Sequence, residues 1–414
     1  MQGYSIRKQL NIPQYKITKI ISENDKEIHI RLEPYKRKAF VCSGCGEVHK
    51  IGYHGVEESV VEDLALFEKR VYLHVVKRRY KCPQDNRIHI EEVPWVKKWG
   101  RVTKRFAERV NRLTAITTNQ EAGWFLGLDD EVVYRIDKEM LEEKAREKLI
   151  PPPAAINISV DEVSYHKYHR YLTNVIDVDE RLVIWNHKGR KAEVLDRYYA
   201  GIGEEGCQSI ESVALDGAKH YISSTSRYAV NALIVYDRFH IMQKLNWAVD
   251  MVRKEELRKA RADENNELVE LINCRQRFIL LKNKSKLTPR QADYLQKLCE
   301  INQPIYKAML LKESFLQIYS YGNIDEAKGF LRSWIKEALS SSLEAFRKIA
   351  TSFMEKAQYI LNWFRKKISS AISEGFNNKI KRLKRMAYGY KDIEYFRLKI
   401  HQHCGLLNPR RFPH

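Results

Sequence analysis

The chain has 414 residues, 44% of them hydrophobic, and its 73 Lys and Arg against 53 Asp and Glu give a formal charge of +20. This length predicts two or three cores at roughly 100–200 residues per domain, and the charge favours a polyanionic partner, with nucleic acid as the leading class. Because there is no apolar run of about 18 residues and no apolar signal region near the start, we expect neither a membrane span nor secretion. Seven scattered cysteines argue against a disulfide framework and allow a metal site.

Residues 1–96 predict a β-rich module that contains a metal knuckle. Short runs typical of strands, YKITKIISE, KEIHIRLEPY and RVYLHVVKRRYKC, alternate with turn residues. Cys42 and Cys45 have the C-x-x-C spacing that lets two thiolates bind a tetrahedral zinc, and Cys82 offers a third thiolate. We therefore expect a zinc-ribbon-like module with a structural Zn²⁺.

The fourth zinc ligand is less well defined by the sequence. Asp85 stands where a second C-x-x-C pair would place its cysteine. We predict His89 as the fourth ligand and keep Asp85 as the alternative, since zinc accepts imidazole nitrogen and carboxylate oxygen. His49 and His54 are less well placed. The competing interpretation is that the module folds around its apolar strands without metal.

Residues 97–150 predict a helix-turn-helix that reads DNA. Apolar residues recur at helical spacing, are interrupted at Gly127-Leu128, and resume after Asp129, which can cap a second helix. Helix, turn and helix is the outline of a DNA-reading motif. We predict that Trp124 and Phe125 lie in the core of the helical pair. The side chains predicted to contact DNA are Lys97, Lys98, Arg101, Lys104 and Arg105 before the motif, and Arg135 and Lys138 on its second helix.

A stiff linker at Pro151-Pro152-Pro153 precedes a change in pattern. Over residues 151–240, three strands in a meander are followed by alternating helix and strand, which indicates an α/β sheet. Residues 241–350 are helical in pattern and too long for a loop, so we expect a helical insertion. Residues 351–414 predict further helices of the α/β domain. The expected fold class is therefore α+β or α/β, with several domains.

Three acidic residues are candidates for a divalent-metal site. Asp161 and Asp216 each end a predicted strand, and carboxylates at neighbouring strand ends can converge at one edge of a sheet. Glu374 is the one acid in the basic stretch AISEGFNNKIKRLKRMAYGYK. Three carboxylates suit a hard cation such as Mg²⁺. The competing interpretation makes the aspartates turn formers and Glu374 a residue favoured by the helix dipole.

The stretches around these acids resemble a known family. SVDEVSYHKYHRYLTNVIDVD, SVALDGAKHY, the tetrad DRFH and EGFNNKIKRLKRMAYGYKDIEYFRLKI are similar to bacterial insertion-sequence transposases of the ISL-three family, and the likeness covers nearly the whole chain. The resemblance implies a catalytic domain with an RNase H-like fold. It also implies an Asp-Asp-Glu (DDE) triad, which maps onto Asp161, Asp216 and Glu374 and would hold Mg²⁺ or Mn²⁺.

Two further groups of residues complete the predicted site. Asp237 and His240 form a D-x-x-H that resembles a signature of several transposase superfamilies, where it helps to shape the active site; the alternative is that Asp237 caps a helix and His240 is a core histidine. The cations that surround Glu374 are expected to hold a phosphate backbone against the metal. They are Lys379, Lys381, Arg382, Lys384 and Arg385.

The expected function is DNA transposition: binding of the terminal inverted repeats of an insertion sequence, followed by metal-dependent strand cleavage and strand transfer. The expected partner is double-stranded DNA, and the resemblance implies at least a homodimer. We expect a cytoplasmic, nucleoid-associated bacterial protein. The alternatives are a domesticated DNA-binding regulator without catalysis, against which the presence of all three acids counts, and a metal-dependent DNA nuclease without strand transfer.

Overall fold

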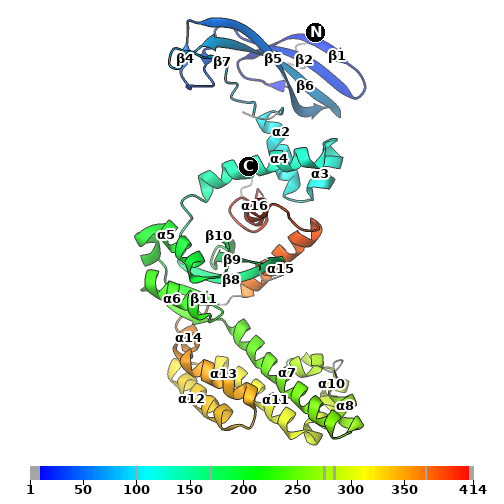
Figure 1. The fold of residues 1–414 in the computed structure, drawn as a ribbon, viewed down its shortest axis with the longest axis vertical. Helices are drawn as coiled ribbons and strands as arrows, with labels where there is room; N and C mark the ends of the chain where they lie inside the picture. The colour runs from blue at the N-terminus through cyan, green and yellow to red at the C-terminus, as the bar shows by residue number, and fades with distance from the viewer. Residues whose placement is uncertain are drawn as a thin grey trace. The chain divides into compact units, whose positions relative to one another are not determined.

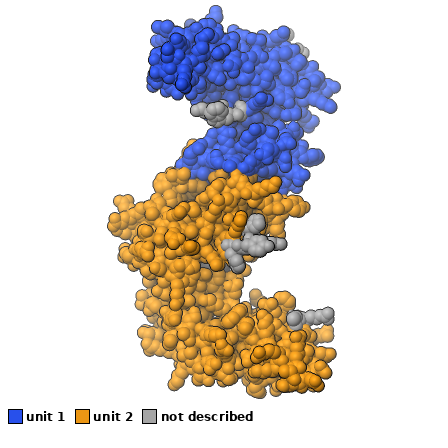
Figure 2. Space-filling view, viewed as in Figure 1, with its two compact units in different colours: residues 1–146, 407–414 blue, residues 147–406 orange. Residues whose placement is uncertain are grey.

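The fold is described from a computed structural model that covers residues 10–97, 101–166, 170–273, 277–282, 286–368 and 371–409. The chain forms two compact units, one of residues 1–146 and 407–414 and one of residues 147–406, which Figure 2 colours separately. Within the described ranges, no helix is both long and apolar enough to cross a membrane. Each unit is described by itself below, with the element labels of Figure 1.

A β-sheet dominates the first part of unit 1, as predicted (Figure 1). Its strands are β1 (Tyr15–Glu23), β2 (Glu27–Pro34), β5 (Tyr53–Leu66), β6 (Lys69–Lys81) and β7 (Ile88–Ile90), and the sheet order is β1-β2-β6-β5 with β7 beside β6. Alternate residues of β2 are buried, so Ile28, Ile30 and Leu32 line one face over a small core. A separate two-stranded ribbon, β3 (Phe40–Val41) with β4 (Val48–His49), carries the cysteine knuckle.

Three helices complete unit 1: α2 (Lys104–Thr114), α3 (Asn119–Leu126) and α4 (Asp130–Lys148). A capping box of Thr118 and Glu121 starts α3, and Gly127 ends it in the left-handed region at φ 68°. The predicted order of helix, short turn and helix is therefore present. The prediction that Trp124 and Phe125 lie in its core is wrong, because α3 packs through Ala122 and Gly123 and leaves the two aromatic rings 85% and 60% exposed.

Unit 2 contains the predicted α/β sheet, built from β8 (Asn157–His166), β9 (Arg170–Asp177), β10 (Leu182–Lys188), β11 (Ser212–Leu215) and β12 (Leu233–Tyr236). The order is β10-β9-β8-β11-β12: the first three strands form an antiparallel meander, and β11 and β12 run parallel to β8. One detail differs from the prediction. Asp161 does not end β8, which continues to His166 because it stays paired with β9 beyond its last partner on β11.

Helices cover both faces of this sheet (Figure 1). On one face, the apolar core joins Ile158, Val160 and Leu215 to the helices α5 (Ala192–Gln208) and α6 (Lys219–Tyr228). On the other face, Val163 packs with Ile380 of α15 (Ala371–Met386) and with α16 (Ile393–Cys404). Residues 159, 161 and 163 alternate with 158, 160 and 162 along β8. Asp161 consequently belongs to the face covered by α15 and α16.

The helical insertion is also present and begins directly after β12. It consists of α7 (Arg238–Ala262), α8 (Asn266–Leu271), α9 (Arg277–Leu281), α10 (Pro289–Ile301), α11 (Gln303–Leu316), the 3₁₀ turn η3 (Gln317–Ser320), α12 (Ile324–Ser340), α13 (Glu344–Glu355), α14 (Ala357–Leu361) and the 3₁₀ turn η4 (Asn362–Phe364). Its own core includes Phe315, Trp334 and Phe353. The chain then returns to the sheet, where the Asn362 side chain donates a hydrogen bond to the Ile234 carbonyl of β12 at 2.8 Å. This return carries the chain to α15.

Candidate functional site

A row of three aspartates spans three adjacent strands of the unit 2 sheet, β8, β11 and β12. The strand register pairs Ala214 of β11 with Ser159 of β8 on one side and with Val235 of β12 on the other. Two residues further along the chain stand Asp161 within β8, Asp216 directly after β11 and Asp237 directly after β12. Residues two apart on a strand point to the same face, and neighbouring strands lie about 4.8 Å apart. The three carboxylates therefore converge on the α15 face of the sheet.

Asp161 is anchored at both of its carboxylate oxygens. Its Oδ1 accepts a hydrogen bond from the backbone N–H of Glu162 at 2.7 Å, and its Oδ2 accepts one from the side-chain amide of Asn377 at 2.7 Å. Burial raises the pKa of the Asp161 carboxyl, and the Asp216 and Asp237 carboxylates act in the same direction, while His240 and the Glu162 N–H oppose them. Like charges held this close favour a bound cation.

Asp237 caps a helix, as one interpretation of the D-x-x-H predicted, and His240 is half-buried beside the aspartate row. Asp237 is buried, caps α7 and accepts a hydrogen bond from the Phe239 N–H at 3.1 Å. His240 Nε2 lies 3.6 Å from Asp237 Oδ2 and 3.9 Å from Asp161 Oδ1. The imidazole thus stands between two carboxylates of the row, and the helix cap and the site contact belong to the same aspartate.

Asp216 is held in a tight turn after β11. The Ala218 N–H donates to its Oδ1 at 2.8 Å. Gly217 has φ 77°, and a Cβ there would lie 2.8 Å from the Tyr236 ring, so both the backbone and the space require glycine. Lys244 and Lys356 lie over the same ring, at 5.2 and 5.7 Å from its centroid. Burial lowers the pKa of both lysines, and Asp216 is close enough to oppose that shift.

Glu374 lies on α15, the helix that runs along β8. Two contacts place this helix: Ser373 Oγ lies 2.7 Å from Ser159 Oγ, and Asn377 reaches Asp161. Glu374 stands between those contact residues and is exposed, about 60° round the helix from Asn377. The acidic row and the helix with the third predicted acid are therefore adjacent. The donors are all hard oxygens, which fits Mg²⁺ or Mn²⁺.

Sequence reasoning missed two polar residues of this site. Asn377 was visible only as part of the NN pair after Glu374. Glu162 follows Asp161 on the opposite face of β8, where its Oε1 lies 3.8 Å from His220 Nε2 on α6. Burial raises the pKa of Glu162. The alternation of strand residues was the one signal available for Glu162, since it directs that carboxylate away from the aspartate row.

The cysteine knuckle of unit 1 forms a second candidate metal site. The ligand atoms of Cys42, Cys45, Cys82 and His49 all lie within 4.8 Å of one another, and Cys45 Sγ is 3.3 Å from His49 Nε2. A tetrahedral zinc with Zn–S bonds of about 2.3 Å spaces its ligands about 3.8 Å apart. Burial opposes ionisation of Cys42, but the Cys45 and Gly44 N–H groups prevail and lower the pKa of its thiol. Three thiols and an imidazole in this arrangement fit zinc.

The prediction of His89 as the fourth ligand is wrong. His89 Nε2 pairs instead with Asp85 Oδ2 at 2.7 Å, and its ring covers Gly44, where a Cβ would approach it to 2.6 Å. The alternative ligand Asp85 is engaged by the same bond. His49, which is four residues after Cys45 on β4, points to the thiols because the β3–β4 turn brings the chain back over the knuckle.

The predicted DNA-contacting cations divide into free and engaged groups. On α15, Lys381, Arg382 and Arg385 are exposed and Lys384 is half-buried, and none of the four has an ion-pair partner in the described part of the chain. Ile380 and Leu383 bury the opposite side of this helix. Lys379 is exposed, and its ammonium donates to the His403 carbonyl.

In unit 1, the predicted DNA contact of Lys97 is wrong, and Arg105 is engaged by an acid of the protein. Lys97 is 4% exposed and its ammonium pairs with Glu143 at 2.6 Å, and Arg105 binds the buried carboxylate of Asp63. Lys97 is internal, whereas Arg105 keeps 38% of its side chain exposed while it neutralises Asp63. Lys98 lies outside the described residues. Arg101, Lys104 and Arg135 are exposed, and Lys138 is half-buried beside Tyr134.

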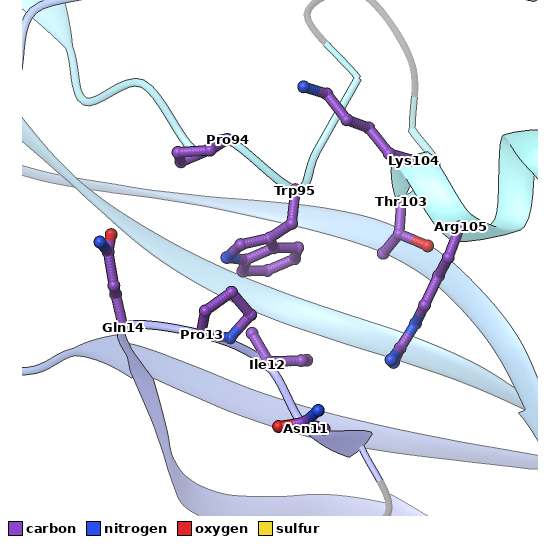
Figure 3. A pocket seen from close by; sticks show the side chains of 9 residues that line it. All are labelled: Asn11, Ile12, Pro13, Gln14, Pro94, Trp95, Thr103, Lys104 and Arg105. Carbon is purple, nitrogen blue, oxygen red and sulfur yellow. The ribbon is translucent and has the colours of Figure 1, made fainter.

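A cavity of about 420 Å³ lies beside the start of α2 in unit 1 (Figure 3). The ring of Trp95 faces Pro13 and Ile12 across it, and Lys104 extends away from the ring. None of the described residues that line it is acidic or a cysteine. It therefore offers no metal-binding set, and the aspartate row and the cysteine knuckle remain the two candidate sites.

Comparisons with known proteins agree with this geometry. A family model described as Transposase, of the ISL3 type, matches residues 158–400, and a model described as the zinc-finger of transposase IS204/IS1001/IS1096/IS1165 matches residues 38–85. The second range contains His49 and ends before His89. The transposase for insertion sequence element IS1001 of Bordetella parapertussis is 32% identical over 381 residues, 91% of each chain. The transposase for IS1557 of Mycobacterium tuberculosis is 26% identical over 342 residues, 78% of this chain and 76% of that protein.

Proposed function

The chain belongs to the ISL3 family of insertion-sequence transposases, and on that premise we propose that it binds the terminal inverted repeats of its element and catalyses metal-dependent strand cleavage and strand transfer. Its catalytic domain is RNase H-like, built on the five-stranded sheet of unit 2. Synapsis of two element ends requires at least a dimer. The single observation that carries the proposal is the aspartate row on β8, β11 and β12, with α15 packed along β8.

In this proposal, Asp161, Asp216 and Glu374 bind the catalytic metal. Bound there, Mg²⁺ or Mn²⁺ activates the attacking oxygen and stabilises the leaving oxygen of an in-line displacement at phosphorus. Asp237 and His240 orient the metal ligands. The Asp237 carboxylate already caps α7, and the His240 ring faces Asp161. Burial raises the pKa of the Asp161 carboxyl, with Asp216 and Asp237 acting in the same direction, so a cation bound there would favour the ionised form of Asp161.

The basic face of α15 holds the DNA backbone in this arrangement. Lys381 and Arg385 follow Glu374 by 7 and 11 residues, which places them within about 20° of it around the helix and about 10 and 16 Å along it. A DNA strand whose scissile phosphate lies at the metal bound by Glu374 would therefore pass these exposed cations on the same face of α15. Phosphate contacts of this kind supply affinity that is independent of sequence.

Unit 1 supplies recognition. We infer that Cys42, Cys45, Cys82 and His49 bind one structural Zn²⁺ that stabilises the knuckle. The turn between α3 and α4 places the exposed Arg135 on the helix proposed to read the element ends. This assigns sequence readout to unit 1 and chemistry to unit 2.

The decisive experiment compares three isosteric variants, Asp161→Asn, Asp216→Asn and Glu374→Gln, on DNA that carries the element ends. Each amide keeps the shape of the side chain and removes the charge that binds the metal. We expect cleavage to be lost in all three while binding in a gel-shift assay stays near that of the parent protein. Asp237→Asn should lose activity only in part, because its carboxylate orients other groups.

The matched control is Asp179→Asn. Asp179 lies in the β9–β10 turn and accepts a hydrogen bond from Asn157 at 2.8 Å, four residues and about 13 Å along β8 from Asp161. The Asp179→Asn variant should cleave the element-end DNA at the rate of the parent protein. Full activity of Glu374→Gln would refute the triad. If the parent protein cleaves the element ends but never joins precut ends to target DNA, it is a nuclease. If it binds the element ends and never cleaves them, it is a regulator.

A further inference from the structure

Asn377 contacts the aspartate row through its side chain. Its amide nitrogen donates to Asp161 Oδ2 at 2.7 Å and lies 3.4 Å from the Glu162 carbonyl oxygen. The residue is only 8% exposed, so water competes little for this bond. A buried amide beside a carboxylate must turn its NH₂ group toward it, because an ionised carboxylate only accepts hydrogen bonds.

This bond completes the immobilisation of Asp161. The Glu162 N–H already holds Oδ1 at 2.7 Å, so each carboxylate oxygen has one fixed donor. A carboxylate held at both oxygens cannot rotate about its Cβ–Cγ bond without breaking one of the two bonds. Each oxygen keeps a further lone pair for a cation.

The same bond also fixes the helix that carries Glu374. Ser373 and Asn377 are four residues apart on α15, about 6 Å, and their partners Ser159 and Asp161 are two residues apart on β8, about 6.6 Å. The matched spacing holds α15 parallel to β8 at two points. Glu374 lies between those points, so its Cα position follows from them.

The chemistry of the donor suits a metal site. A lysine or arginine at position 377 would also hold Asp161, but its positive charge would neutralise the carboxylate and compete with the metal. An amide donates without adding charge. The oxygen of the Asn377 amide has no partner among the described residues, so nothing in the described chain draws the group away from Asp161.

From these contacts we infer that Asn377 is a positioning residue for metal binding, which sets the orientation of Asp161 and the height of Glu374 above the sheet. This rests on the proposed function, because it assigns Asn377 a role toward the same metal. In this role, Asn377 is not itself a ligand of the metal. It acts through Asp161 and through the seating of α15.

The sheet supplies a matched control residue. Asn174 of β9 is the register partner of Asp161 on its other side and is fully buried, yet neither atom of its side-chain amide has a partner in the described structure. It resembles Asn377 in residue type, burial and nearness to Asp161. It differs in lacking the hydrogen bond to the carboxylate.

The test measures Mn²⁺ binding by the full chain without DNA, through water-proton relaxation, for the parent protein and for Asn377→Leu, Asn174→Leu and Asp161→Asn. Leucine keeps the volume of asparagine and removes the donor; Asn377→Ala serves if leucine does not fit. We expect Asn377→Leu to weaken Mn²⁺ binding about 10- to 100-fold, the usual effect of losing a hydrogen bond to a metal ligand. For Asn377→Leu, the Mg²⁺ concentration that gives half-maximal cleavage should rise in parallel. At saturating Mg²⁺, this variant should recover most of the cleavage rate of the parent protein.

The outcomes separate the two hypotheses. Asn174→Leu should bind Mn²⁺ like the parent protein. If Asn377→Leu stays within twofold of the parent, or if Asn174→Leu weakens binding equally, the positioning role is overturned while the proposed function stands. If Asp161→Asn itself retains both Mn²⁺ binding and cleavage, the proposed metal site at Asp161 has failed, and the role of Asn377 fails with it.

Discussion

The buried histidine of α16 predicts a specific pH dependence of stability. His401 is 5% exposed, and its ring lies beside the Val183 carbonyl of β10. Burial, assisted by the positive charge of Arg397, lowers its pKa from 6.5 to about 3. The folded protein therefore keeps this imidazole neutral at pH values where the unfolded chain binds a proton.

The sign and size follow from proton linkage. The folded pKa lies below the unfolded one, so the contribution of His401 is fully present above pH 6.5 and is lost as the pH falls toward 3. At pH 5 the unfolded state is stabilised by RT ln(1 + 10^1.5), which is about 2 kcal/mol relative to pH 8. With a urea m-value of about 2 kcal/mol/M, the midpoint should drop by about 1 M.

The assay is urea unfolding at pH 8 and pH 5, followed by tryptophan fluorescence, for the parent protein, His401→Gln and His54→Gln. Glutamine cannot titrate, so His401→Gln should lose about 1 M less between the two pH values than the parent does, whatever its stability at pH 8. His54 is exposed, and its replacement should leave the parent's pH dependence unchanged. Parallel shifts in the parent and in His401→Gln would refute the reasoning.

Two further predictions concern binding. Purified protein should hold one zinc per chain; His49→Ala should reduce it below about half an equivalent, whereas His89→Ala should keep it, and metal analysis decides between the two ligands. Changing Arg382 and Lys384 together to Ala should weaken binding to duplex DNA and lower the slope of log affinity against log salt by about 0.9 for each phosphate that the protein no longer neutralises. A slope equal to that of the parent would mean that these two cations do not touch phosphate.

The parts of the fold that could be predicted are those in which apolar residues recur at the spacing of a helix or a strand. The β module, the helix-turn-helix outline, the three-strand meander and the helical insertion each show their own repeat of apolar residues. Trp124 and Phe125 were misplaced because their helix is short: with so few turns, the small Ala122 and Gly123 suffice as a packing face, and periodicity does not reveal which face is used.

The candidate sites depend on contacts between distant residues, and there the sequence was less informative. Asp161 and Asp216 could be proposed from strand positions, but Asn377 lies 216 residues from Asp161, and nothing local indicates their bond. Lys97 and Arg105 appeared to be free cations because their partners, Glu143 and Asp63, are distant in the chain. The choice of His49 over His89 likewise depends on how the β3–β4 turn folds over the knuckle.

The order of the elements along the chain has a consequence for synthesis on the ribosome. Residues 1–146 of unit 1, the sheet of unit 2 and the whole helical insertion emerge before α15, so Glu374 and Asn377 are among the last residues of the site to be translated. A nascent chain released before residue 371 would carry the proposed DNA-reading helices and the three aspartates, but neither the third acid nor the amide that holds Asp161. On the proposed function, a product that stops within the insertion would keep the helices proposed to read DNA and would lack part of the proposed metal site.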